Sequence, residues 1–257
     1  MSEEQYQVRI AGCTDTGLKR NHNEDHIGFN QQLGIAVLAD GMGGHKAGEI
    51  AAHMAVESVL EKLQDLVDQQ SSGVITGSQI LEFVSNTISD SNNMIYQASE
   101  AQDEHKGMGT TLVAAVIEES QIYAGHVGDS RLYLFRDRIL KRITRDHSLV
   151  QDLVDRGSYT EEEARVANVG HIVTRALGTK AEVEVDTAQH ELQGDDLLLL
   201  CSDGLSDMVA DWSIEETLKE RGEDLQATAS KLVDLANRNG GKDNISVILM
   251  QVYDTED

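Results

Sequence analysis

The sequence predicts a single α+β domain in which antiparallel strands carry pairs of helices. Two segments early in the chain, residues 47–63 and about 78–98, have apolar residues at helical spacing. Short segments rich in β-branched and aromatic residues follow at residues 110–143, which is typical of antiparallel strands. No linker divides the 257 residues, and this length is enough for one large core. We therefore expect one domain over residues 1–257, with its core at about 8–252.

Two strands are expected before the first helix. Polar and apolar residues alternate over residues 6–12, which indicates a half-buried strand. The apolar run at residues 35–39 indicates a buried strand, and it leads into the glycine-rich turn at residues 40–44. On its own this turn is more typical of an ordinary tight loop than of a functional site, because Gly and Asp are common turn residues.

The two early helices each carry one apolar stripe. The stripes are Ala52, Val56, Val59, Leu60 and Leu63 in the first helix, and Leu81, Val84, Ile88 and Ile95 in the second. Residues 69–73 read as a short turn between them. We therefore expect an antiparallel helix pair that lies on one face of a sheet.

The second half of the chain alternates between strands and helices. Residues 110–117, 121–127, 131–135 and 139–143 are expected to pair consecutively as a meander. Residues 147–178 are expected to be mostly helical, with Thr160 and Glu163 as a capping box. The later elements are expected to be strands at 181–188, 195–201 and 245–250, a helix capped by Ser213 with Glu216, and a helix at 224–239.

Composition excludes several classes of protein. The net charge of −24, from 45 acidic and 21 basic residues, repels nucleic acid and anionic membranes. No apolar run approaches the roughly 20 residues of a membrane span, and the first residues are acidic and polar, unlike a secretory signal. Cys13 and Cys201 lie in apolar runs, as core residues of a reduced protein do. We expect a cytoplasmic protein that binds neither nucleic acid nor membrane.

Four aspartates stand at strand ends. Asp40, Asp129 and Asp203 each follow an apolar strand, and Asp243 precedes one. If these side chains converge, they repel one another by several kcal/mol unless cations are bound. Oxygen ligands without a Cys or His cluster favour Mg²⁺ or Mn²⁺ over Zn²⁺. The sequence places the acids at strand ends but does not show that they meet.

A polar segment near the N-terminus allows two interpretations. Arg20 precedes Glu24 by four residues, and Asp25 follows directly. These groups either form a surface salt bridge, worth less than about 1 kcal/mol, or bind a phosphate and a metal-bound water.

Seven short motifs occur in an order that resembles a known family. They are Arg20-x-x-Asn23-Glu24-Asp25, Asp40-Gly41-Met42-Gly43-Gly44, Gly109-Thr110-Thr111, Gly128-Asp129-Ser130-Arg131, Thr144-x-Asp146-His147-Ser148, Ser202-Asp203-Gly204-Leu205 and Asp243-Asn244-Ile245-Ser246. Over residues of about 8–252 the chain resembles the bacterial metal-dependent protein serine/threonine phosphatases of the 2C type. Each motif is weak alone, whereas seven in order are specific.

The resemblance implies a four-layer α/β/β/α sandwich, with two antiparallel sheets flanked by helix pairs. It also implies two Mn²⁺ or Mg²⁺ ions between the sheet ends. By motif, Asp40 bridges the two metals and the carbonyl of Gly41 binds one of them. Asp203 and Asp243 bind the other. A metal-bridging hydroxide then attacks phosphorus, without a covalent phosphoenzyme.

Further residues receive roles from the same resemblance. Asp25, with Glu24, holds metal-bound waters. Asp129 joins Asp203 at a weaker third metal site. Arg20 grips the substrate phosphate, for which the guanidinium fork suits the oxygens better than an ammonium group does.

One position departs from the animal members of this family. They have His directly after Asp-Gly as the proposed general acid, whereas this chain has Met42, as bacterial relatives commonly do. Two donors are therefore open: His45, or a water on the third metal. His45 serves equally well as a cap of the following helix. We also expect residues of about 146–175 to form a mobile flap, with Lys46, Arg145 and Arg175 offsetting the acidic surface.

The leading hypothesis is a monomeric phosphatase that acts on phosphoserine and phosphothreonine. Its expected partners are phosphorylated proteins, including a serine/threonine kinase. A regulatory module that binds phosphoproteins without hydrolysing them is an alternative, disfavoured because the acidic positions are intact. A structural Ca²⁺ module is disfavoured because the chain has no Asp-x-Asp-x-Asp-Gly loop.

Overall fold

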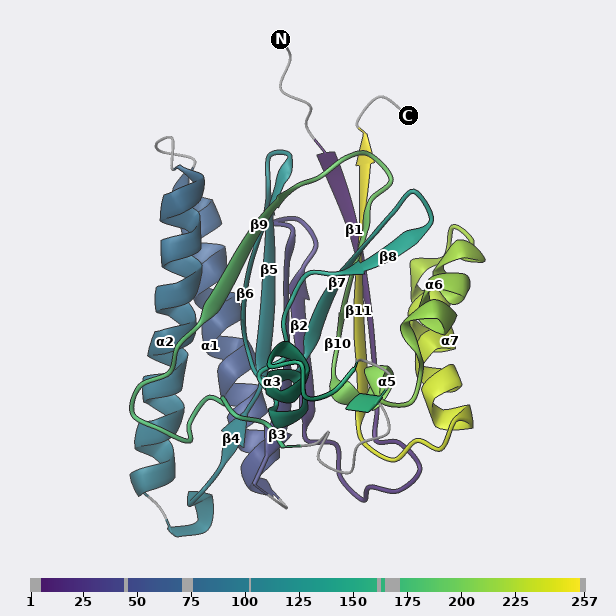
Figure 1. Cartoon of the computed structure of the whole chain (residues 1–257). Coiled ribbons are helices and arrows are strands. Elements are labelled where there is room, and N and C mark those ends of the chain that lie inside the picture. Colours follow the sequence, from purple (N-terminus) through teal and green to yellow (C-terminus); the bar gives the residue numbers. More distant parts are fainter. Residues whose placement is uncertain are drawn as a thin grey trace.

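The protein is built in four layers, with two face-to-face sheets between two groups of helices (Figure 1). The computed structural model describes residues 6–43, 46–70, 76–101, 103–160, 163–164 and 172–254. One sheet carries the long helices α1 and α2, and the other carries α6 and α7. This arrangement confirms the α/β/β/α sandwich. None of the helices in these ranges is long and apolar enough to cross a membrane.

Both sheets are antiparallel. The first has the order β1-β11-β10-β7-β8, with β1 Tyr6–Asp15, β11 Ile245–Asp254, β10 Leu197–Cys201, β7 Arg131–Arg136 and β8 Ile139–Arg142. The second has the order β2-β3-β5-β6-β9, with β2 Asp25–Asn30, β3 Ile35–Met42, β5 Leu112–Glu118, β6 Gln121–Val127 and β9 Asp186–Glu191, and the short strand β4, Gly109–Thr110, pairs with β3.

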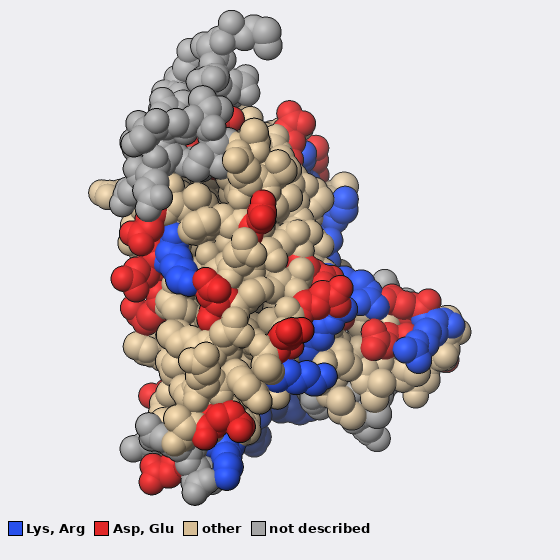
Figure 2. Space-filling model, turned by 90° about the vertical axis from the view of Figure 1, so that its left-hand side faces the viewer, with Lys and Arg blue, Asp and Glu red and all other residues tan. Residues whose placement is uncertain are grey.

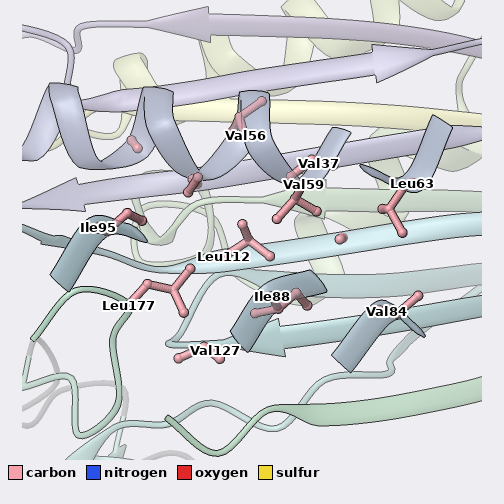
Figure 3. Close-up of a cluster of buried hydrophobic side chains, with 14 of the residues drawn as sticks. Val37, Val56, Val59, Leu63, Val84, Ile88, Ile95, Leu112, Val127 and Leu177 are labelled. Atoms are coloured by element: carbon pink, nitrogen blue, oxygen red, sulfur yellow. The ribbon is translucent and has the colours of Figure 1, made fainter. Parts of the chain in front are cut away.

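The four longest helices, α1, α2, α6 and α7, lie on the outer faces of the sheets, and the described chain has shorter helices besides them. In chain order the helices are α1 Lys46–Gln70, α2 Gly77–Ala101, the 3-10 helix η1 Asp103–His105, α3 Leu149–Asp155, α5 Asp203–Ser206, α6 Asp211–Lys219 and α7 Leu225–Arg238. Figure 3 shows apolar side chains of α1 and α2, among them Val56 and Ile88, meeting Val37 and Leu112 of the second sheet. The two long helices expected from the apolar stripes are confirmed, and each extends beyond its predicted range.

Strand β3 explains the unbroken apolar run at residues 35–39. Val37 and Ala39 face the helix layer, whereas Ala36 and Leu38 face the core between the two sheets. A strand that is buried on both faces needs apolar residues at every position. The same alternation directs Asp40, which follows Ala36 and Leu38 at even spacing, toward the space between the sheets.

The predicted meander is wrong at one point. β5 and β6 pair as expected, but the next strand, β7, pairs with β10 in the other sheet. The chain therefore changes sheets at residues 128–130. Local sequence patterns indicate strands but not their partners, and these strands are apolar enough for either sheet.

Other boundaries also differ from the sequence prediction. β2 was not predicted, and β9 begins at Asp186 rather than at residue 181. Within residues 147–178, α3 is helical but the described residues 172–178 are not. The cap of α6 is Ala210, so Ser213 lies inside the helix. The capping box is confirmed, since the backbone N–H groups of Thr160 and Glu163 each bond to the other's side chain.

Candidate metal centre

Two carboxylates from one sheet face each other at the edge of the inter-sheet core. Asp40 ends the apolar part of β3, and Asp25 lies directly opposite it in the β2–β3 pairing. Ile27, two residues after Asp25, packs between the sheets, so Asp25 points to the same side. Asp25 is only 6% exposed, and its Oδ2 accepts a 2.8 Å hydrogen bond from the hydroxyl of Ser202.

Two further carboxylates arrive from the other sheet. Asp203 opens α5 directly after β10, and Asp243 stands just before β11, which pairs with β10. Asp129 lies in the crossing between the sheets and is 8% exposed. The strand-end aspartates of the prediction thus come from both sheets and from the segment that joins them.

The electrostatics show that these groups share one site. Burial raises the pKa of Asp40 well above its ordinary value, and the charges of its acidic neighbours raise it further. In order of effect these neighbours are Asp25, Asp203, Asp129 and Asp243. Burial likewise raises the pKa of Asp203, and the charge of Asp129 adds to the effect. The expected convergence of the carboxylates is therefore present in the fold.

This cluster fits divalent cations. Burial raises the pKa of Asp25 and of Asp129 to about 6 each. Asp25 Oδ1 and Asp203 Oδ1 are buried and have no hydrogen-bond partner, which is costly for a carboxylate unless another ligand satisfies it. A set of carboxylate and carbonyl oxygens suits hard ions such as Mg²⁺ and Mn²⁺.

Gly41 is required by a close approach of the backbone. A Cβ at this position would lie 2.2 Å from the carbonyl oxygen of Gly48 and 2.7 Å from that of Glu24. The N–H of Gly41 donates to the same Glu24 oxygen at 3.1 Å. The glycine therefore lets the start of α1 pack closely against the turn after β3.

The other motif residues hold these acids in place. The Thr110 hydroxyl and the Thr111 N–H both donate to the backbone oxygen of Asp40, at 2.9 and 2.8 Å. Thr111 is also 2.7 Å from the hydroxyl of Ser130, which ties the turn after β3 to the sheet crossing. Asn244 accepts from the N–H of Glu24 at 2.8 Å and so fixes the start of β2.

Arg20 lies at the rim of the cluster. Its Nη2 donates to Asp243 Oδ2 at 2.7 Å, and the two side chains are 53% and 35% exposed. This hydrogen bond raises the pKa of Arg20, and the charges of Asp243, Glu24 and Asp40 act in the same direction. The negative charges of the site therefore act on the guanidinium of Arg20, which is paired with Asp243.

Asp207 belongs near the site and was missed by the sequence interpretation. Its charge raises the pKa of both Asp203 and Asp129. The spacing in the sequence could have indicated it, because Asp207 follows Asp203 by four residues and side chains at this spacing on a helix lie close together. Asp146 also acts on Asp129, but Arg131 holds it with hydrogen bonds of 2.7–3.1 Å.

Two predictions fall wholly or partly outside the described residues. His45 lies outside them, so its role as a proton donor stays a prediction. Met42 is the last residue of β3 and is partly exposed. The expected flap at 146–175 includes residues 161–162 and 165–171, which are also outside the described ranges.

Comparison with known proteins gives consistent matches. A family model described as "Protein phosphatase 2C" matches residues 18–248. The serine/threonine phosphatase stp of Listeria monocytogenes is 40% identical over 241 residues, which cover 93% of each chain. The catalytic domain of the serine threonine protein phosphatase PstP, solved with two manganese ions, is 38% identical with a TM-score of 0.84, and the match covers 97% of this chain and 100% of that one. Serine/threonine phosphatase Stp1 from Staphylococcus aureus is 36% identical with a TM-score of 0.87, covering 98% and 97%.

Proposed function

We propose that Asp40, Asp129, Asp203 and Asp243 hold catalytic Mn²⁺ or Mg²⁺ ions, since this chain belongs to the protein phosphatase 2C family. It is a metal-dependent serine/threonine protein phosphatase. The observation that carries the proposal is the convergence of these acids around buried oxygens that lack a partner. Its substrates are phosphoproteins.

We assign the ligands as follows. Asp40, opposite Asp25 at the end of β3, would hold both ions, and the carbonyl of Gly41 would contribute a further oxygen ligand to one of them. Asp203 and Asp243, which flank the paired strands β10 and β11, bind the other. Asp129 and Asp203 would hold a weaker third ion, which the charge of Asp207 would favour.

The remaining residues act on the substrate and on water. When bound, the ions supply a hydroxide nucleophile at neutral pH and neutralise phosphate charge. Arg20 exchanges its hydrogen bond with Asp243 for a phosphate oxygen of the substrate, because a guanidinium is a forked donor. Asp25 and Glu24 accept hydrogen bonds from water in the site and orient it. His45 donates a proton to the leaving alkoxide.

We also propose the cellular setting. The protein is a monomeric cytoplasmic enzyme in which residues 1–257 form one catalytic domain, with a flap at residues 146–175. It reverses a serine/threonine kinase in bacterial signalling, and it binds neither nucleic acid nor membrane. The net charge of −24 supports the last point.

The assignment is tested by hydrolysis of phosphoserine and phosphothreonine peptides and of p-nitrophenyl phosphate. We expect activity with Mn²⁺, no activity with EDTA, and a loss of at least about 100-fold in Asp203→Asn, or about 2.7 kcal/mol of transition-state stabilisation. Asp234→Asn, at an exposed position of α7, is the matched control and keeps its activity. Full activity in EDTA, or in Asp203→Asn, would contradict the assignment.

A further inference from the structure

A second group of possible metal ligands lies on the outer side of β2. His26, His53 and Glu57 each offer one ligand atom, and these atoms all lie within 4.8 Å of one another. His53 and Glu57 are four residues apart on α1 and therefore share one face of the helix. His26 comes from β2, so the group joins a helix to a strand.

This group faces away from the aspartate cluster. Side chains alternate along a strand, so His26 and Asp25 point to opposite faces of β2. Helix α1 packs on the outer face of β2. Val56 of α1 comes so close to Gly28 of β2 that a Cβ on the glycine would lie 2.7 Å from it. The two groups of ligands are therefore separated by the sheet.

The geometry is that of ligands arranged around a gap. The rings of His26 and His53 are 4.6 Å apart between centroids and inclined by 47°. His26 Nε2 is 3.8 Å from Glu57 Oε1, too far for a hydrogen bond. In a tetrahedral zinc site, with bonds of about 2.0–2.1 Å, ligand atoms lie roughly 3.3 Å apart. His53 and Glu57 are exposed, so their side chains are free of tight packing, and we expect them to rotate toward a bound ion.

The chemistry of this group differs from that of the catalytic cluster. Two imidazoles with one carboxylate are ligands for Zn²⁺ and related transition metals, whereas Mg²⁺ prefers oxygen. Glu49, one helical turn before His53, also acts electrostatically on His26 and adds negative charge. Such a field attracts cations.

A second histidine-containing group does not qualify. His126, His147 and Asp186 also lie within ligand distance of one another. However, Arg175 donates to Asp186 at 2.7 Å and so places a positive charge there. The N–H of Gly128 donates to His147 Nδ1 at 3.1 Å, so that nitrogen is already used.

We propose that His26, His53 and Glu57 bind Zn²⁺ or a related transition metal at a site distinct from the catalytic centre. The bound ion links α1 to the edge strand β2. The bound ion fixes the strand whose first residue is Asp25. Its expected effect is greater stability of the α1–β2 contact.

The proposal is tested by titrating the whole protein with Zn²⁺ after chelator treatment, in saturating Mg²⁺ so that the oxygen sites are filled. The measurements are calorimetry, the melting temperature and the NMR signals of the imidazole nitrogens. We expect wild type to bind one more Zn²⁺ per chain than His53→Ala, and we expect Glu57→Gln to bind it at least tenfold more weakly. Zn²⁺ should raise the melting temperature of wild type but not that of His53→Ala.

Matched controls separate this site from general zinc binding. His190→Ala, on β9, and Glu61→Gln, one turn further along α1, should behave as wild type. Equal zinc uptake by wild type and His53→Ala would overturn the proposal. So would signals of His26 and His53 that do not move with one equivalent of Zn²⁺.

Discussion

Neutralising Asp25 should stabilise the metal-free protein, and bound metal should reduce or reverse that gain. Asp25→Asn keeps the shape of the side chain, and the amide oxygen still accepts from Ser202. What it removes is a carboxylate that is 6% exposed, whose pKa is raised first by burial and then by the charge of Asp243. Without cations these charges oppose folding, whereas with cations they hold the ions.

The magnitude follows from the pKa of Asp25, which rises from 3.8 to about 6 on folding. A difference of about two in pKa corresponds to about 3 kcal/mol. Because the folded-state pKa is raised, the folded protein binds the extra proton. The favourable contribution is therefore complete below pH 3.8 and is lost as the pH rises through about 6. At pH 7.5 the metal-free wild type has lost about 3 kcal/mol that Asp25→Asn retains, and at pH 5 roughly half of that.

The assay is thermal unfolding followed by circular dichroism, in EDTA and in saturating Mn²⁺. In EDTA at pH 7.5 we expect Asp25→Asn to melt about 6–12 °C above wild type, with a smaller difference at pH 5. In Mn²⁺ the difference should shrink or reverse, because binding stabilises wild type more. Asp234→Asn, exposed on α7, should show none of these changes. A variant that melts at or below wild type in EDTA at pH 7.5 would refute the reasoning.

Three further substitutions test other parts of the site. Arg20→Lys should raise KM for phosphopeptides several-fold with a smaller effect on kcat, because the ammonium lacks the fork; steady-state kinetics with an unchanged KM would contradict this role. Gly41→Ala should lower the free energy of unfolding by about 3 kcal/mol or more, since the new Cβ would lie 2.2 Å from the Gly48 oxygen. Urea unfolding measures this loss of stability. An unfolding midpoint equal to that of wild type would show that the backbone moves to accommodate the methyl group. Asp146→Asn should lower the free energy of unfolding by about 3–5 kcal/mol, because Arg131, only 18% exposed, loses its anionic partner. Thermal unfolding measures the loss, and a change near zero would mean that water replaces the carboxylate.

Local patterns were enough to predict α1, α2, α7 and most strands. The stripes of α1 and α2 follow the helical period because one face of each helix packs on a sheet. Strand β2 was missed because its residues show neither alternation nor an apolar run: its outer face carries His26 and the glycine at position 28, on which α1 lies directly. A glycine there is set by the packing of a distant helix, which no local pattern contains.

Strand partners could not be predicted in the same way. β1 pairs with β11, although one is near the start of the chain and the other near its end. Each is compatible with several partners, and only the closed arrangement of both sheets selects among them. The same limit applied to the site: the residues placed four aspartates at strand ends, but only the family resemblance implied that they meet.

Surface charge offers little guidance to where the site lies. On the face shown in Figure 2, acidic and basic side chains are interspersed among large uncharged areas. Asp25 and Asp203 are instead distinguished by a buried carboxylate oxygen, Oδ1 in each, that has no hydrogen-bond partner. A net charge of −24 therefore describes the solvated surface and does not by itself identify a metal centre.

The position of the site follows from the one crossing that the meander prediction missed. At Gly128 the backbone has φ of +110°, and a Cβ there would lie 2.6 Å from Thr111, so only glycine allows the chain to leave β6 at this angle. The next residue, Asp129, lies in the crossing between the two sheets, and its charge raises the pKa of both Asp40 and Asp203. Cations bound among these three carboxylates would connect both sheets at an edge where the apolar inter-sheet core has ended. We therefore expect metal binding to be coupled to the relative placement of the sheets, because the same carboxylates repel one another when no ions are bound.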